Sequence, residues 1–403
     1  MVGAACGAAS ALFLVLLDRA TALRESQPNI VYGLPVAGLV MGRVLEALGP
    51  TVRRGTSQII DAINDRQASP HVEVPWLLAP VVLIGTVLTH LFGGSAGREG
   101  TAVQMGGALG EAAARLGRAG AALRRQLLLA GVAGGFGSVF GTPLAGTIFA
   151  LEFAARGRVP TDALLPALVA ALIGDAVTRG LGVLHTPYPT VAPLPFTAAV
   201  FGKWALFAIA VGATSAAFLL GLALVKRFVG AHLRRLPLAM AVGGLLIIAL
   251  WRGLGTEVYL GLGVPNIEHA FVDPSLPASH FLGKLLFTLV TVGSGFLGGE
   301  VTPLFFVGAS LGNWLSGPLS LPLAMSAGVG LVAVFATAAN TPVALCVMAV
   351  ELLGAAVLPH AALVCVIARA LLSSSFGGLG LYSAQRPAAE EAGRPPAGDQ
   401  GSG

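Results

Sequence analysis

The sequence predicts an all-α polytopic membrane protein built from two repeated halves. Hydrophobic residues make up 55% and charged residues 11% of the 403 residues, whereas a soluble domain carries about 25% charged residues. Uncharged stretches include 74–97, 204–225 and 301–350. A helix that crosses the hydrocarbon core of about 30 Å needs roughly 20 apolar residues, so the longest stretch can cross twice. Strand signals at barrel spacing are missing, which favours helical spans.

The expected helices follow the apolar stretches and the Gly and Pro residues that interrupt them. They cover 2–23, 30–48, 56–64, 73–91, 98–116, 121–138, 142–156, 160–180, 197–227, 234–252, 278–292, 301–316, 322–336, 340–355 and 358–374. The first 17 residues lack a basic start, so we expect an uncleaved first helix rather than a signal peptide.

A Pro-rich linker, "HTPYPTVAPLPF" at 185–196, divides the chain. We therefore predict a first transmembrane half over 1–195 and a second over 196–385. The small, polar, Pro-rich stretch 386–403 is typical of a disordered tail. Basic pairs such as Arg53-Arg54 and Arg234-Arg235 lie in short loops, where they mark cytoplasmic loop ends and indicate no nucleic-acid site.

The composition also bears on the class of membrane protein. The chain holds 55 Gly and 25 Pro, which interrupt helices, and broken helices at membrane depth are tolerated where they line an enclosed cavity. This favours a transporter or channel. The three Cys residues lack the spacing of metal ligands and are expected to be small core residues. Because the sequence shows neither a metal cluster nor a phosphate loop, we expect no metal and no cofactor. The seven His residues are scattered, which argues against a membrane enzyme acting on lipid-linked substrates.

Two pairs of similar segments reveal the repeat. "GREGTAVQMGGALG" at 97–110 aligns without gaps on "GEVTPLFFVGASLG" at 299–312, and "TPLAGTIFALE" at 142–152 matches "TPVALCVMAVE" at 341–351. The segments occur in the same order at nearly the same separation. Repeats related by a pseudo-two-fold axis place their substrate at the interface between the halves, near the bilayer midplane.

The glycine-rich segments predict an anion site. Each is followed at once by an apolar helix, so the first-turn amides of 99–102 and 300–304 would point into the shared cavity. A helix N-terminus carries roughly half a positive charge and unpaired N–H groups, which favour an anion. Glu99 lies in this break and is itself an anion, so proton and ion occupancy would exclude one another. The alternative is an acid that merely complements the helix dipole.

Three motifs resemble the CLC family of chloride channels and anion–proton antiporters. They are "GREG" at 97–100, "GSGFLGGEVTP" at 293–303 and "GLYSAQR" at 380–386, and the resemblance runs over about 1–386. It implies an inverted repeat whose broken helices meet at a central anion site. It also implies a homodimer with one anion pathway in each subunit.

Departures from the family pattern point to one branch. Val301 stands where the family has phenylalanine, and Phe153 stands where chloride–proton exchangers carry a second, internal glutamate. The "GGEVTP" block and the "YSAQR" ending are similar to the fluoride–proton antiporter branch. The resemblance implies that Glu99 is the gating and proton-carrying residue and that Glu300 serves proton coupling. For Glu300, a capping acid at the start of helix 301–316 is the alternative.

The resemblance also implies a set of anion-binding residues. Thr302 would offer a hydroxyl donor, Val301 its backbone, and Tyr382 the inner-gate hydroxyl or ring edge. Thr56 takes the place of the family's anion-binding serine. Phe305, Phe306 and Phe376 could present ring edges to fluoride, with apolar packing as the alternative.

Other polar residues are expected to be structural. Arg98 would pair with a carboxylate or carbonyl groups near the break. Glu152 and Glu351, at equivalent repeat positions, would have a structural role or face the mouth of the pathway. His90 and Lys284 would each make a satisfied polar contact or snorkel.

The resulting expectation is a dimeric, multi-pass inner-membrane protein that exports fluoride in exchange for protons. It would not be an enzyme. Its partners would be fluoride or chloride, protons, the lipid bilayer and a second copy of the chain, without nucleic acid. The alternative is a chloride-selective channel or a chloride–proton exchanger of the same family.

Overall fold

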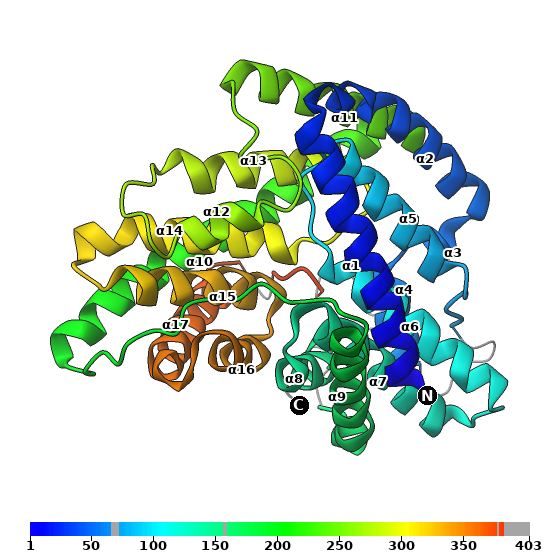
Figure 1. The fold of residues 1–403 in the computed structure, drawn as a ribbon, viewed down its shortest axis with the longest axis horizontal. Coiled ribbons are helices and arrows are strands. Elements are labelled where there is room, and N and C mark those ends of the chain that lie inside the picture. Colours follow the sequence, from blue (N-terminus) through cyan, green and yellow to red (C-terminus); the bar gives the residue numbers. More distant parts are fainter. Residues whose placement is uncertain (66–71, 156–158, 377–378, 383–403) are drawn as a thin grey trace, which may run out of the picture.

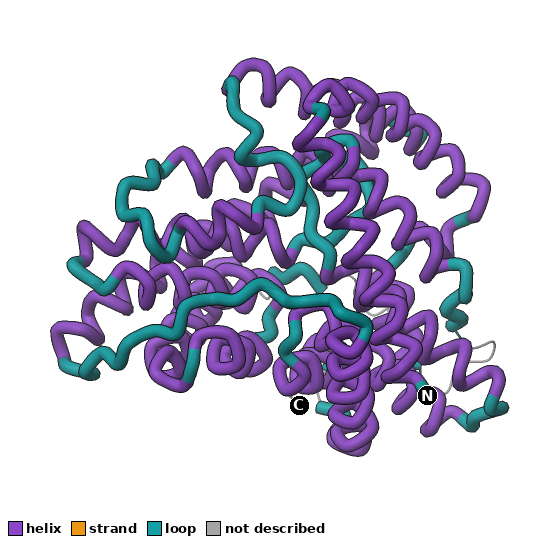
Figure 2. Tube along the Cα trace, viewed as in Figure 1, coloured by secondary structure: helices purple, strands orange, loops and turns teal. Residues whose placement is uncertain are grey.

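The computed structural model describes residues 1–65, 72–155, 159–376 and 379–382. These residues form 17 α-helices and three short 3₁₀-helices, joined by loops (Figure 2). One isolated antiparallel β-bridge joins Gly97 and Gly299. The predicted tail, 386–403, lies outside the described residues.

The first half contains α1 (Val2–Ser26), η1 (Pro28–Gly33), α2 (Leu34–Leu48), α3 (Pro50–Arg53), α4 (Thr56–Asn64), α5 (Leu78–Leu91), α6 (Glu99–Leu116), α7 (Ala121–Phe140), α8 (Pro143–Phe153), η2 (Thr161–Ala163) and α9 (Leu164–Gly180). The second half contains α10 (Ala198–His232), α11 (Leu236–Leu254), α12 (Val264–His269), α13 (Ser279–Gly293), α14 (Val301–Leu319), α15 (Leu323–Ala339), α16 (Pro342–Leu353), η3 (Ala355–Val357) and α17 (Leu358–Phe376).

The helices confirm a multi-pass integral membrane protein. Among the described residues, six helical stretches are long and apolar enough to cross a membrane. Several shorter apolar helices, including α5, α8 and α16, do not reach that length. Large side chains on the longer helices face outward: Leu165 on α9 is 68% exposed and Leu206 on α10 is 59% exposed. Lipid is the solvent that such a surface requires.

The two halves use the same close helix packing. Gly106 on α6 and Gly308 on α14 are equivalent positions of the repeat. A Cβ atom on Gly106 would lie 2.0 Å from the carbonyl oxygen of Gly131 on α7. A Cβ atom on Gly308 would lie 2.0 Å from the carbonyl oxygen of Gly330 on α15. Only glycine permits such backbone approach, as is typical of small-residue contacts between membrane helices.

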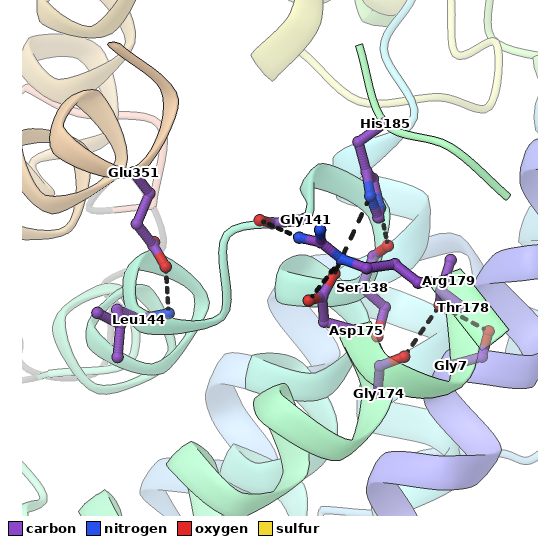
Figure 3. A network of polar contacts seen from close by, with 10 residues as sticks. All are labelled: Gly7, Ser138, Gly141, Leu144, Gly174, Asp175, Thr178, Arg179, His185 and Glu351. Carbon is purple, nitrogen blue, oxygen red and sulfur yellow. Dashed lines mark hydrogen bonds and ion pairs between the residues drawn. The ribbon is translucent and has the colours of Figure 1, made fainter. Parts of the chain in front are cut away.

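A reciprocal pair of caps confirms that the repeat is inverted. The carboxylate of Glu152, near the end of α8, accepts hydrogen bonds from the first-turn N–H groups of Val343 (3.2 Å) and Ala344 (2.8 Å) on α16. The carboxylate of Glu351, near the end of α16, accepts from the equivalent N–H groups on α8, at 3.0 and 2.7 Å; Figure 3 shows the bond to Leu144. The two helices therefore lie antiparallel, each capping the other.

The predicted linker runs between the halves without regular structure. Residues 183–197 contain no helix, and Figure 1 shows this segment crossing the molecule from α9 to α10. Its backbone is held to the second half, because the N–H of Val191 donates to the carbonyl of Leu353 (3.0 Å). The imidazole Nε2 of His360 also lies 3.2 Å from the carbonyl oxygen of Leu194.

Some helix boundaries were predicted wrongly. The helix expected over 73–91 begins at Leu78, since Pro75 interrupts the chain and the carbonyl of Glu73 accepts from the side chain of Gln58 (2.6 Å). The helix expected over 142–156 ends at Phe153. Two short helices, α3 and α12, were missed because four and six residues carry too little periodicity to detect.

Candidate anion site

Two glycines bring the halves together at the centre of the molecule. The N–H of Gly97 donates to the carbonyl of Gly299 (2.6 Å), and the N–H of Gly299 donates to the carbonyl of Gly97 (2.8 Å). The two positions are equivalent in the repeat, so the pseudo-two-fold axis passes between them. Helices α6 and α14 each begin two residues beyond this bridge, and their N-termini meet here.

Glu99 is fully buried at the first position of α6, with 0% exposure. Its Oε2 accepts from the N–H of Thr302 (3.1 Å) and from the N–H of Arg98 (3.0 Å). Its Oε1 accepts from the hydroxyl of Thr302, and the Nε atom of Arg98 lies 3.6 Å away. The carboxylate of one half therefore occupies the N-terminus of a helix from the other half, where positive potential is concentrated.

Thr302 and Val301 form the first turn of α14 and are 3% and 1% exposed. Thr302 supplies two donors to the same carboxylate, one from its backbone and one from its side chain. Any anion that replaced the carboxylate would find the same two donors. Arg98 contacts this carboxylate, in agreement with the pairing expected from the sequence.

Glu300 is the N-cap residue of α14 and is only half-buried. Its side chain makes no capping hydrogen bond to the helix, which removes the support for the alternative of a simple capping acid. The charges that act on its carboxylate are those of Lys226 on α10 and Glu99. It therefore lies within electrostatic reach of the buried site without joining its hydrogen bonds.

Tyr382 is half-buried beyond the end of α17. Its ring makes edge contacts with Phe153 (centroids 5.1 Å apart, interplanar angle 88°) and Phe149 (6.5 Å, 78°). The N–H of Leu381 donates to the carbonyl of Ala338 (2.8 Å), which fixes this segment against the end of α15. The carboxylates of Glu300 and Glu99 both act electrostatically on the Tyr382 hydroxyl.

Thr56 is the first residue of α4, and its hydroxyl accepts from the side-chain amide of Gln104 (3.0 Å). Gln104 lies on α6, five residues after Glu99. Thr56 is therefore joined to the helix that begins at the buried carboxylate, while its own contact with an anion stays a prediction.

Comparison with known proteins decides the family. The model of the voltage gated chloride channel family matches residues 37–373. The chain belongs to this CLC family. It is 47% identical over 399 residues to the "Chloride/fluoride channel protein" of Pseudomonas syringae pv. tomato, covering 96% of this chain and 85% of the relative.

Solved structures of CLC proteins share the fold. A crystal structure of a CLC-type fluoride/proton antiporter superposes with a TM-score of 0.89 at 32% identity, covering 96% of this chain and 95% of the other. A slow cyanobacterial Cl⁻/H⁺ antiporter superposes with a TM-score of 0.78 at 21% identity, covering 95% of both chains; this likeness concerns the fold alone.

The three candidate phenylalanines of this CLC protein lie in different surroundings. Phe305 is buried between Phe140 (5.4 Å between centroids) and Phe335 (6.0 Å). Phe306 is buried beneath the ammonium group of Lys284, 5.4 Å from the ring centroid. Phe376 ends α17 and is 45% exposed. The first two rings thus lie in the buried second turn of α14, apart from the exposed third.

Two buried basic residues are held by backbone carbonyl groups, as expected for satisfied polar contacts. The fully buried Lys284 donates to the carbonyls of Tyr259 (3.2 Å) and Gly261 (2.6 Å). The ring nitrogens of His90 lie 2.7 and 2.8 Å from the carbonyl oxygens of Thr86 and Ala96. Within the described residues, no group of three or more His, Cys, Asp or Glu residues could hold a metal.

Sequence reasoning missed one basic residue of this region. Arg24 on α1 is only 6% exposed, and its Nη1 lies 3.5 Å from the carbonyl oxygen of His90. Its only sequence signal was a charge near the end of an apolar span, which is equally typical of a residue that faces the membrane surface.

Proposed function

We propose that this CLC protein is a fluoride–proton antiporter of the cell's inner membrane, which exports fluoride in exchange for protons. The observation that carries the proposal is the position of the Glu99 carboxylate. It accepts hydrogen bonds from the backbone and hydroxyl of Thr302, at the buried N-terminus of a helix from the opposite half. A carboxylate held there competes with a mobile anion for the same donors.

Protonation of Glu99 would release those donors. The ionised carboxylate makes charge-assisted hydrogen bonds, which are roughly twice as strong as neutral ones. A proton on Glu99 removes this advantage, so the side chain leaves and an anion binds at Thr302. Return of the carboxylate requires loss of the proton and expels the anion. Protons and anions thereby move in opposite directions.

Fluoride is the anion that these donors favour. Thr302 offers an N–H and an O–H group within the same turn, and a small, hard ion with a tightly held hydration shell needs such strong donors to replace its water. Val301 contributes the adjacent backbone, and Tyr382 a hydroxyl on the other side of the pathway. The names of two relatives, a chloride/fluoride channel protein and a CLC-type fluoride/proton antiporter, support this assignment.

Glu300 is proposed to pass protons between Glu99 and the membrane face nearer Lys226. Its carboxylate is half-buried and makes no capping bond, and Phe153 occupies the position at which chloride–proton exchangers carry their internal acid. Thr56 is assigned to the inner end of the pathway through its link to Gln104. Ring-edge contacts of Phe305, Phe306 and Phe376 with the ion stay a prediction, with apolar packing as the alternative.

The resemblance to the CLC family supports a homodimer in the bilayer with one pathway in each subunit. No cofactor enters this mechanism, because a proton and an anion exchange at one carboxylate without any covalent chemistry.

Flux through the reconstituted protein tests the proposal. Liposomes loaded with fluoride or chloride are diluted into halide-free medium, and anion efflux is followed with ion-selective electrodes beside proton uptake with a pH electrode. We expect fluoride efflux with proportional proton uptake and much slower chloride efflux. Fluoride efflux without proton uptake would identify a channel, and equal chloride efflux would favour the chloride-selective alternative.

A further inference from the structure

A pocket of about 290 Å³ lies toward the end of α1, beside the break that carries Glu99. Its lining combines the last turns of α1 with Arg98 and the segment 257–266. Chain segments from both halves therefore enclose it. The proposed antiport mechanism assigns no step to any of these side chains, although Arg98 contacts Glu99.

Three polar atoms lining the pocket lack a hydrogen-bond partner among the described residues. They are the hydroxyl of Thr21, the Nε of Arg24 and the Nε of Arg98. All three are donors, and a buried donor without a partner is costly. Arg24 is only 6% exposed, and the Arg98 side chain is 13% exposed. The pocket thus presents one N–H of the buried Arg24, one N–H of the partly buried Arg98 and the hydroxyl of Thr21, each of which can donate to an acceptor.

The acidic residues of the pocket lie at its rim. Asp18, Glu25 and Glu257 line it but are exposed, and the Glu25 side chain, 58% exposed, contacts Nη2 of Arg24 at 3.2 Å. Water and salt screen charges in this position, whereas buried charges are screened much less. The guanidinium groups of Arg24 and Arg98 therefore lie deeper in the pocket than the three carboxylates.

The position of Arg24 is fixed from behind. A Cβ atom on Gly261 would lie 2.1 Å from its Nη1, so its guanidinium packs directly on that backbone. The carbonyl of Gly261 accepts from the buried ammonium of Lys284 (2.6 Å). Arg24 and Lys284 therefore both contact Gly261, which holds Arg24 at this wall of the pocket.

We propose that this pocket is an anion-binding site at which a small monovalent anion waits next to the gate. Arg24, Arg98 and Thr21 supply the donors. The Nε of Arg98 also lies 3.6 Å from the Glu99 carboxylate, so Arg98 can interact with both the carboxylate and an anion in the pocket. When Glu99 is protonated and loses its charge, Arg98 interacts with the anion alone. The site rests on the proposed function for the identity of the anion and for the role of Glu99 as the gate.

The test measures the initial rate of anion efflux from liposomes as a function of luminal fluoride, for the wild type and Arg24→Gln. Loss of one charged donor should raise the half-saturating concentration about tenfold, with the proton-to-fluoride ratio unchanged. Arg19→Gln, an exposed position on the same helix, is the matched control. The difference should shrink in high concentrations of an impermeant salt, because screening weakens attraction to the pocket; a merely structural effect would persist.

A second variant covers the case in which Arg24→Gln does not fold. Thr21→Val keeps the side-chain shape and removes one donor, so we expect a smaller rise in the half-saturating concentration. An unchanged half-saturating concentration in both variants, or an equal shift in Arg19→Gln, would contradict the proposed anion site in the pocket. The antiport proposal would not be affected by either result. If the protein transports chloride instead of fluoride, the same shifts measured with chloride would support the pocket while the fluoride assignment fails.

Discussion

Gly97 and Gly299 exchange a pair of backbone hydrogen bonds across the pseudo-two-fold axis of the protein. Both residues end a glycine-rich break, and each is followed by the helix that forms one side of the anion site. The bridge therefore sets the distance between Glu99 on one half and Thr302 on the other. The predictions that follow concern this junction and the contacts that support it.

Gly299→Ala should separate the two helix starts. A Cβ atom there would lie 2.6 Å from the backbone nitrogen of Gly100, which cannot move without displacing Glu99. We expect a loss of about 1–3 kcal/mol in stability, as for other overpacked positions, together with slower fluoride efflux. Thermal unfolding and liposome flux measure both. Gly202→Ala, where no atom lies within 4 Å, is the control and should change neither.

Glu99→Gln should abolish proton coupling. The amide keeps the size of the side chain but cannot give up a proton, so the ratio of proton uptake to fluoride efflux should fall to background. Glu73→Gln is the control, since the Glu73 side chain is 69% exposed and has no role in the proposed transport mechanism. Proton uptake that still matches the fluoride efflux in Glu99→Gln would show that another residue is the gate.

Glu300→Gln should slow coupled exchange while leaving fluoride binding nearly unchanged. The Glu300 carboxylate lies outside the hydrogen bonds of the buried site. Replacing this protonatable group should therefore slow proton transfer without changing how much fluoride occupies the site. Proton uptake is compared with equilibrium fluoride binding measured by calorimetry. Weaker binding with intact coupling would instead place Glu300 in contact with the ion.

Thr302→Val should reduce fluoride transport more than chloride transport. The hydroxyl is lost and the backbone donor stays, and a missing hydrogen bond to an ion costs about 1.5–3 kcal/mol, or roughly tenfold or more in rate. Thr302→Ser restores the hydroxyl and should recover most of the rate. The ratio of fluoride to chloride efflux is the measurement, and an unchanged ratio in Thr302→Val would remove Thr302 from the basis of selectivity.

Glu152→Ala and Glu351→Ala should destabilise the protein to a similar extent. Each carboxylate caps the helix that carries the other, and loss of such a cap costs about 1 kcal/mol. Unfolding midpoints in detergent should fall equally, with Glu73→Ala unchanged and proton coupling retained. A loss of coupling without a loss of stability in either variant would assign that glutamate to the transport pathway.

Local composition predicted much of this arrangement. The segments between the interrupting Gly and Pro residues were correctly predicted to be helices. The gapless match of "GREG" on "GEVT" predicted that Gly97 and Gly299 are equivalent. The same match identified Glu99 as an acid at a helix start. The start of α5 was predicted wrongly: Pro75 interrupts the chain, and a nonlocal contact, in which the side chain of Gln58 on another helix binds the backbone of Glu73, holds the preceding segment.

By itself, the sequence determined that the chain lies in a membrane, that its halves repeat and that an acid lies in a break between helices, because hydropathy, repeat spacing and glycine content are properties of local sequence. Only the tertiary structure decided which partner each buried polar group meets. Glu99 binds the opposite half at Thr302, Glu152 and Glu351 cap one another's helices, and Arg24 enters a pocket. These contacts join residues up to about two hundred positions apart, and the cost of leaving a buried polar group unpaired selects them only when the helices have packed.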